Sequence, residues 1–303
     1  MWLFVKILAA AVIYGTAIEP RIVVREDYAA PIPALPAAWE GKQVAVFADL
    51  QIGMWWANTD AVRRVVAKTV RLNPAFVLIA GDFVYKGEHE VVALTQEVLG
   101  LLQPLIDSKI PTYAVLGNHD YELMNEGSRK ETHVARRVRF ALDSAGIHMM
   151  DNRSVAMWAP GADSATSAPL YIVGVGDRWA INDAASATLA KLPPGAPRIV
   201  FMHNPDSYAQ IAANQAPLAV AAHTHGMQLG IPFVSDWLWR TQFSDEGSGV
   251  AGWVDDYGQP GNRLYINRGI GFSIVPGRIN AFPELTVFTL TKAQPTAPAP
   301  QAP

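Results

Sequence analysis

Five short apolar runs in this chain each lead into an acidic, amide or imidazole side chain. The runs span residues 44–48, 76–80, 112–116, 199–202 and 218–222. The polar residues that follow them are Asp49, Asp82, Asn118 with His119 and Asp120, His203, and His223 with His225. In open α/β sheets ligands bind at the carboxyl ends of the strands, so five such strand ends can converge on one place. The pattern therefore predicts an α/β fold with a single site at one edge of its sheets.

Helix signals alternate with the apolar runs. Capping residues or helical periodicity occur in the segments 58–72, 91–102 and 128–146, the last of which opens on the capping-box pair Ser128 and Glu131. Further apolar runs follow at 170–175, 264–266 and 285–290. Alternating strands and helices predict an α/β domain, and the second half, richer in strands and glycine, predicts that the sheets are mixed.

The two ends of the chain differ in composition from the middle. Residues 1–18 are largely apolar, which fits a membrane anchor; a cleaved signal segment and a buried helix are the alternatives. We expect a Pro-rich tether at 19–38, a folded domain at 39–291 and a disordered Pro/Ala tail at 292–303. The protein is thus expected at a cell membrane, or exported after cleavage. The positive charges that flank the segment do not determine on which side of the membrane the domain lies.

Composition narrows the chemistry of the predicted site. The chain of 303 residues has no cysteine, which excludes disulfides, thiolate catalysis and cysteine-ligated zinc. Its net charge of −3 indicates no nucleic acid partner. Carboxylate, amide and imidazole ligands suit Mn, Fe or Zn. Six or so such ligands exceed the need of one tetrahedral ion, so we expect two metal ions that share a carboxylate.

These residues resemble the sequence blocks of the calcineurin-like metallophosphoesterases. The blocks stand here as Asp49-Leu-Gln51, Gly81-Asp82, Gly117-Asn-His-Asp120, His203 and Ala222-His-Thr-His225, in the order and spacing of that superfamily. Within it the chain is similar to the membrane-anchored bacterial branch that includes YkuE- and YaeI-like proteins, which shares the "NRGIG" of residues 267–271. The resemblance implies a single catalytic domain: a sandwich of two mixed β-sheets flanked by helices.

The resemblance also implies an activity. It indicates a dinuclear-metal-dependent phosphohydrolase that cleaves a phosphodiester, phosphomonoester or pyrophosphate by attack of a metal-bridging hydroxide. The metal ligands that it assigns are Asp49, Gln51, Asp82 and His225 for one ion, and Asp82, Asn118, His203 and His223 for the other. The candidate catalytic residues are His119, which would stabilise or protonate the leaving oxygen, and Asp120, which would orient His119 or its loop.

Gln51 is the main departure from the pattern, because the family usually has a histidine there. A neutral amide is a weaker ligand than imidazole. Purple acid phosphatases, a branch of the same superfamily, also lack this histidine and use a tyrosine at the Gly-Asp-x-x-Tyr spacing, where this chain has Tyr85. Tyr85 is therefore either a ligand or near neighbour of an iron-like first metal, or an ordinary packed aromatic.

Three other side chains are candidates for substrate binding. Arg178 follows another strand end and could grip a phosphate, or it could form a surface salt bridge. Trp55 and Trp56 could flank the mouth of the site and receive a lipid-like substrate, or they could pack in the core or a loop. The expected partners are a phosphorylated small-molecule or lipid-like substrate and, through the N-terminal segment, a membrane.

Two other functions compete with the general phosphoesterase. One is a lipid-linked nucleotide pyrophosphatase that acts on UDP-diacylglucosamine, as some anchored relatives do. The other is an inactive metal-binding scaffold, suggested by Gln51 in the place of a histidine. The presence of His119 argues against the scaffold, because a protein without turnover has no need of a leaving-group acid.

Overall fold

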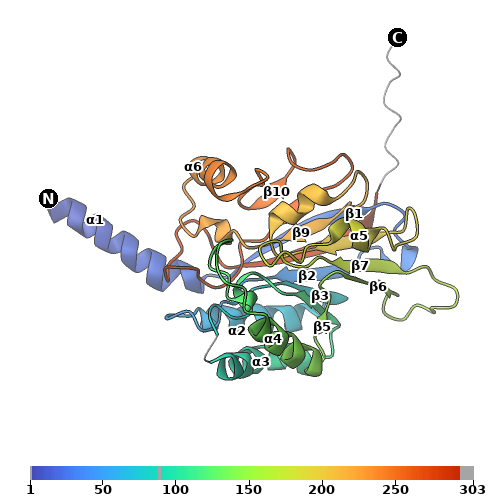
Figure 1. Ribbon diagram of the computed structural model, residues 1–303, viewed down its shortest axis with the longest axis horizontal. Helices are drawn as coiled ribbons and strands as arrows, with labels where there is room; N and C mark the ends of the chain where they lie inside the picture. The colour runs from blue at the N-terminus through green and yellow to red at the C-terminus, as the bar shows by residue number, and fades with distance from the viewer. Residues whose placement is uncertain (1, 88–89, 294–303) are drawn as a thin grey trace, which may run out of the picture.

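The computed structural model describes residues 2–87 and 90–293. Within them the chain forms two six-stranded β-sheets that pack face to face, with helices on the outer sides (Figure 1). The strands are β1 (Val24–Ile32), β2 (Gln43–Phe47), β3 (Phe76–Ala80), β4 (Thr112–Val115), β5 (His148–Met149), β6 (Arg153–Met157), β7 (Leu170–Gly174), β8 (Arg198–Phe201), β9 (Ala219–Ala221), β10 (Gly252–Val254), β11 (Leu264–Ile266) and β12 (Glu284–Lys292). The helices are α1 (Trp2–Ile13), α2 (Thr59–Leu72), α3 (Val91–Asp107), α4 (Thr132–Ser144), α5 (Ala185–Leu189) and α6 (Val234–Leu238).

Both sheets are mixed, which confirms the predicted fold class. The first has the order β1-β12-β2-β3-β4-β5; all its pairs are parallel except that of β12 with β2. The second has the order β10-β11-β9-β8-β7-β6; its central strands are parallel and its two edge strands are antiparallel. The parallel strands β2, β3 and β4 of one sheet and β8 and β9 of the other end in the predicted site residues.

The apolar runs are continuous because these strands are buried on both faces. Val46 and Leu78 of the first sheet face the interior of the sandwich, where they join a cluster that includes Phe201 of the second. Their neighbours Phe47 and Val77 belong to a different cluster, formed with residues of α2, α3 and α4. Both faces of these strands therefore contribute apolar contacts, which holds the strand ends in fixed positions.

The predicted capping box at the start of α4 does not form. The helix begins at Thr132, and the Glu131 side chain makes no capping hydrogen bond. Ser128 instead accepts hydrogen bonds at its hydroxyl from the backbone N–H groups of Met124 and Asn125, at 3.2 and 3.1 Å. The serine therefore closes a turn ahead of the helix, a competing use of such residues.

The predicted irregular tether at 19–38 is wrong for much of its length. Residues 24–32 form β1, which pairs in parallel with β12 from Val24 opposite Glu284 to Ile32 opposite Lys292. Pro31 is tolerated because β1 is an edge strand, where a missing backbone N–H can face away from the sheet. The folded domain therefore begins before residue 39. The predicted Pro/Ala tail lies, from residue 294 onward, outside the described residues.

The N-terminal helix projects away from the sandwich (Figure 1). None of the residues of α1 is buried, and the chain continues in helical conformation as far as Arg21. Trp2–Arg21 is long and apolar enough to cross a membrane or to act as a signal sequence. The exposure of α1 does not fit the alternative of a buried helix.

Candidate metal centre

Left-handed backbone conformations follow several of the parallel strands. Asp49 (φ 54°) comes after β2, Asp82 (φ 57°) after β3, and His223 (φ 73°) and His225 (φ 52°) after β9. A residue other than glycine held in such a conformation costs on the order of 1–3 kcal/mol, and this strain is concentrated at functional sites. The chain thus accepts a local energetic cost to place these four side chains at the strand ends.

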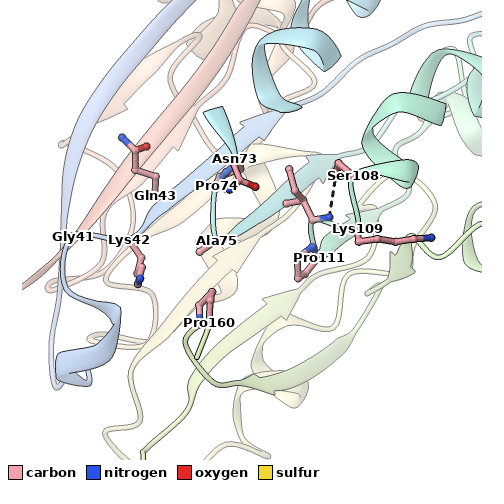
Figure 2. Close-up of a pocket in the computed structure, with 11 residues that line it drawn as sticks. Gly41, Lys42, Gln43, Asn73, Pro74, Ala75, Ser108, Lys109, Pro111 and Pro160 are labelled. Carbon is pink, nitrogen blue, oxygen red and sulfur yellow. Dashed lines mark hydrogen bonds between the residues drawn. The ribbon is translucent and has the colours of Figure 1, made fainter. Parts of the chain in front are cut away.

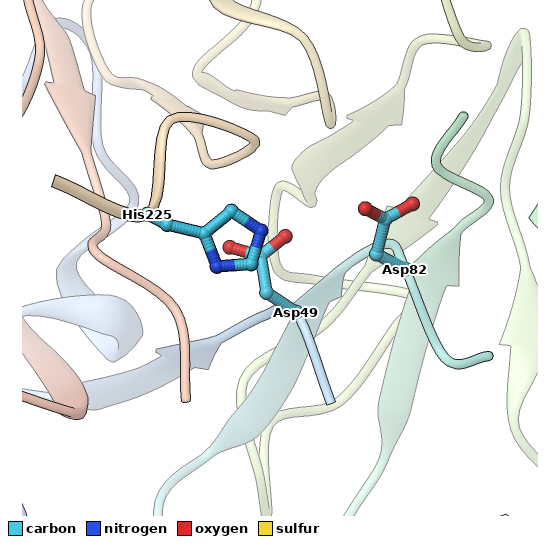
Figure 3. Close-up of side chains that lie close together, drawn as sticks. All are labelled: Asp49, Asp82 and His225. Carbon is cyan, nitrogen blue, oxygen red and sulfur yellow. The ribbon is translucent and has the colours of Figure 1, made fainter. Parts of the chain in front are cut away.

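Asp49, Asp82 and His225 form one buried cluster (Figure 3). Each offers a ligand atom that lies within 4.8 Å of the others. In the described part of the chain, neither carboxylate oxygen of Asp49 accepts a hydrogen bond of normal geometry. The backbone N–H of His223 has only a small lowering effect on the pKa of Asp49. Buried oxygens without partners are costly, and a cation bound among them would remove that cost.

Gln51 lies in the same cluster. Its Nε2 donates to Asp82 Oδ2 at 2.7 Å and lies 3.4 Å from His225 Nε2. Its Oε1 is buried and, within the described residues, has no hydrogen-bond partner. The amide therefore occupies the position that the sequence assigns to a first-metal ligand, with an unsatisfied oxygen available.

Asn118, His203 and His223 form a second cluster that shares Asp82 with the first. Asn118 Oδ1 lies 3.0 Å from His203 Nε2 and 2.8 Å from His223 Nδ1. His203 Nε2 is also 3.3 Å from Asp82 Oδ2. Because His203 Nδ1 donates to the Ala80 carbonyl at 2.8 Å, the neutral ring turns the lone pair of Nε2 toward these oxygens. Lone pairs that face one another repel unless a proton or a metal ion lies between them.

The electrostatics of the two clusters favour a bound cation. Burial raises the pKa of Asp49 to about 7. Burial alone would lower the pKa of His203, but the carboxylates of Asp82 and Asp49 outweigh it and raise that pKa to about 10. Burial lowers the pKa of His223 to about 3 and that of His225 well below its usual value. The site thus combines two buried carboxyl groups with the neutral imidazoles of His223 and His225, and with His203, whose proton a metal ion would replace. This donor set fits divalent metal ions.

His119 lies at the border of these clusters. Its backbone N–H donates to Asp82 Oδ1 at 3.0 Å, and its ring Nδ1 donates to the Tyr85 carbonyl at 3.0 Å. Among the described residues no hydrogen bond is found for the other ring nitrogen, Nε2, which can therefore accept a proton. Burial lowers the pKa of this histidine.

Asp120 has a different environment from His119. Its carboxylate accepts hydrogen bonds from the backbone N–H groups of Asp82, Phe83, Val84 and Gly117, at 2.9 to 3.1 Å. Burial raises its pKa, and the N–H groups act in the opposite direction. Asp120 is predicted to orient either His119 or the surrounding loop. These contacts support the second role, because they fix the turn that carries Asp82.

The contacts of Tyr85 favour the packed aromatic over the iron ligand. Its ring stacks on His119, with 4.7 Å between ring centroids and 26° between planes. Its hydroxyl accepts a hydrogen bond from the Ile274 N–H at 3.3 Å. Tyr85 thus supports one face of His119, and its role as a ligand stays an untested prediction.

The three candidate substrate-binding residues have distinct environments. Arg178 pairs with Glu246 at 2.8 Å and with Asp183 at 3.7 Å, the salt-bridge alternative that the sequence left open. Trp55 and Trp56 are 71% and 52% exposed, so they do not pack in the core. Their rings contact each other instead, with centroids 6.4 Å apart.

Sequence reasoning gave no role to Arg278, a wholly buried residue behind His225. Its guanidinium donates to the backbone carbonyls of Gly271, Arg268 and Ala281, and its Nη2 lies 3.5 Å from His225 Nδ1. Burial lowers its pKa to about 10. Arg278 fixes the loop after β11, which in turn covers Asp49.

Gly269 in that loop is required by the approach to Asp49. It has φ 66°, and a Cβ placed on it would lie 2.1 Å from Asp49 Oδ2. The signal for it was present in the sequence: the run 264–266 also ends on a polar residue, Asn267, followed by "RGIG". The pattern of an apolar run followed by a polar residue therefore also points to this loop as part of the site.

None of the residues that line the cavity drawn in Figure 2 is a metal-ligand candidate. Its volume is about 470 Å³, and its lining includes residues 41–43, 73–75 and 108–111. These segments lead into β2, β3 and β4, whereas the metal-ligand candidates follow the carboxyl ends of the same strands. The donor atoms, rather than the size of an open cavity, therefore locate the functional site.

Comparisons with known proteins agree with this geometry. The model of the calcineurin-like phosphoesterase family matches residues 42–227, which include all the metal-ligand candidates. Phosphodiesterase YaeI of Escherichia coli is 27% identical over 277 residues, which cover 90% of this chain and 87% of that protein. The uncharacterised metallophosphoesterase YkuE of Bacillus subtilis is 22% identical over 277 residues, covering 91% of this chain and 88% of that protein.

A third relative carries a more specific name. The UDP-2,3-diacylglucosamine pyrophosphatase LpxG of Chlamydia trachomatis is 22% identical over 309 residues, covering 88% of this chain and 89% of that protein. The family match extends over more than half of the chain and includes both clusters around Asp82. The chain is therefore a hydrolase that belongs to the calcineurin-like phosphoesterase family.

Proposed function

We propose that this protein is a phosphohydrolase that binds two metal ions, of the kind Mn, Fe or Zn, with Asp82 shared between them. The observation that carries the proposal is the position of Asp82 Oδ2. It lies 2.7 Å from Gln51 in the first cluster and 3.3 Å from His203 in the second. A carboxylate between two sets of donors is the arrangement that a two-metal phosphoesterase needs.

Metal ions bound there would supply Lewis acidity and activate a water molecule as the nucleophile at neutral pH. The remaining steps fall to the chain's own residues. His119 keeps one ring proton on Nδ1, which the Tyr85 carbonyl accepts. Its Nε2 would take up a second proton, as the attacking water loses one, and give it to the leaving oxygen. Asp120 holds the Asp82 turn through three of its backbone N–H groups, so that the shared carboxylate keeps its position.

The proposed substrate is a phosphorylated lipid-like molecule, cleaved at a phosphodiester or pyrophosphate bond. Two observations support it: the name of the LpxG relative, and an exposed N-terminal helix long enough to cross a membrane. Trp55 and Trp56 add exposed aromatic surface a few residues after Asp49. We accordingly propose a single N-terminal membrane anchor, with export after signal cleavage as the alternative.

Removal of metal is expected to abolish hydrolysis by the full chain purified in detergent. After dialysis against a chelator, the protein should hydrolyse neither bis(p-nitrophenyl) phosphate nor a UDP-linked diacylated sugar. Addition of Mn should restore turnover, with two metal ions per chain by elemental analysis. Turnover that persists in metal-free protein would refute the proposal. Metal binding without turnover of either substrate would favour the scaffold.

Replacement of Gln51 by His is expected to tighten the first metal. Imidazole is the better ligand, and histidine is among the residues that tolerate positive φ, here 53°. We expect an increase in affinity on the order of tenfold, equivalent to ~1.4 kcal/mol, measured by competition with a chelating dye. The matched control is Gln51→Asn, whose shorter amide should bind the metal more weakly than the parent. Weaker metal retention in Gln51→His would contradict the assignment.

A further inference from the structure

The end of the N-terminal helix is fixed to the catalytic domain. Glu19 is buried, and its carboxylate accepts hydrogen bonds from the backbone N–H groups of Asn280 and Ala281 at 2.9 and 2.7 Å. The Arg278 N–H donates to the Gly15 carbonyl at 2.8 Å, and the Asn58 side chain donates to the Pro20 carbonyl at 2.9 Å. Because these bonds join the helix to the domain without a flexible linker, the direction of α1 sets the orientation of the domain.

Two segments that adjoin this attachment expose large apolar side chains. They form a surface that we call the apolar rim, made up of Leu229, Ile231, Phe233, Trp237, Ile274 and Val275. Phe233 is 93% exposed, Ile274 75% and Trp237 61%. Exposed apolar groups gathered in this way mark a surface that binds a partner or a membrane.

The two segments of the rim are joined to each other and to the helix. Leu229 and Ile279 form a β-bridge, and the Gln228 side chain donates to the Val275 carbonyl at 2.9 Å. A Cβ placed on Gly15 would lie 2.7 Å from Ile279 Cγ1, so the helix packs directly against this segment. In Figure 1, α6 lies on the same side of the molecule as α1, and the orange-red chain before β12 reaches the end of that helix. The rim is therefore continuous with the exposed apolar surface of α1.

The rim also borders the metal centre. Ile274 donates its N–H to the hydroxyl of Tyr85, whose ring stacks on His119. Arg278 contacts Gly15 through its backbone and approaches His225 through its guanidinium. Arg278 thus connects Gly15, in the N-terminal helical segment, with His225, a proposed metal ligand.

We propose that the apolar rim lies in the interfacial layer of the bilayer that α1 enters, and that it holds the metal centre against the lipid headgroups. The proposal rests on the membrane anchor proposed above. Continuity with α1 identifies the occupant as lipid rather than another protein, and an exposed tryptophan beside aliphatic residues is typical of a membrane interface. Phosphates carried by membrane lipids would then reach the site without leaving the bilayer surface.

The chain contains no cysteine, which allows a direct test with single labels. Phe233→Cys and Ile274→Cys would each carry an environment-sensitive nitrobenzoxadiazole fluorophore, with the full chain reconstituted in phosphatidylcholine vesicles. Phe140→Cys, at a 69% exposed position on α4, is the matched control for an apolar side chain away from the rim. Leu8→Cys, on the exposed surface of α1, reports on the anchor itself.

Labels at 233 and 274 are expected to emit at shorter wavelength, to resist quenching by iodide and to be quenched by lipids that carry a nitroxide. The label at 140 should show the opposite pattern. If the labels at 233 and 274 behave like that at 140 while the label at 8 is quenched by lipid, the rim proposal is overturned and the anchor stands. If iodide quenches the label at 8, both the anchor and the rim proposal are refuted. Neither result bears on the proposed metal-dependent hydrolysis, which is tested separately.

Discussion

Replacement of Asp82 by Asn is expected to abolish turnover and leave the fold intact. The asparagine Oδ1 can still accept the His119 N–H that Asp82 Oδ1 accepts at 3.0 Å. The second oxygen, which faces Gln51 and His203, becomes an NH₂ group and loses its charge. The loss of the proposed bridging ligand should lower kcat/KM by a factor on the order of 10³ or more, ~4 kcal/mol of transition-state stabilisation. Steady-state kinetics together with metal content per chain measure the effect.

A second buried aspartate provides the control for this variant. Asp151 forms an ion pair with Arg139 at 2.8 Å and lies outside both metal clusters. Asp151→Asn should lower the melting temperature, because it weakens a buried ion pair, but folded protein should keep its full metal content. If Asp82→Asn retains both metal and activity, Asp82 does not bridge the two clusters.

The strand-end pattern predicted most of the site because of how parallel strands are buried. Runs such as 44–48 and 76–80 lie between the other sheet on one side and helices on the other, so they are apolar throughout. A charged residue such as Asp49 or Asp82 directly after such a run stands out, and the common direction of the strands places it near the others. The fold class and the convergence of these side chains could therefore be predicted from the order of the residues, whereas the assignment of individual metal ligands comes from the family resemblance and stays a prediction.

The remaining parts depend on contacts that sequence order does not show. Pro31 argues against a strand at 24–32, because proline is excluded from the interior of a sheet. The sequence does not reveal that this strand forms the edge of a sheet, where proline is tolerated. Arg278 occurs in no recognised block, yet it lies behind His225 because the loop after β11 folds over the strand ends. The spacing of Tyr85 leaves two roles open, metal ligand or packed aromatic, because its contacts with His119 and Ile274 depend on the course of two loops.

Replacement of His119 by Ala is expected to cost more with a poor leaving group than with a good one. A residue that protonates the leaving oxygen contributes about 10²–10⁴-fold to the rate, and that contribution is needed for an alkoxide but not for a p-nitrophenolate. Rates of an alkyl phosphodiester should therefore fall by this factor, whereas bis(p-nitrophenyl) phosphate should lose far less.

Metal content distinguishes this role of His119 from a structural one. His119→Ala should keep both metal ions, because its ring bonds to the Tyr85 carbonyl and stacks on the Tyr85 ring rather than joining the ligand clusters. Tyr85→Phe is the matched variant: it keeps the ring and the carbonyl that orient His119 and loses only the hydroxyl bonded to Ile274, so it should stay close to the parent with both substrates. Equal losses of His119→Ala with the two substrates, or loss of metal, would show that His119 acts on the metal centre rather than on the leaving oxygen. A proton donor must affect the two leaving groups unequally, because only one of them requires the proton.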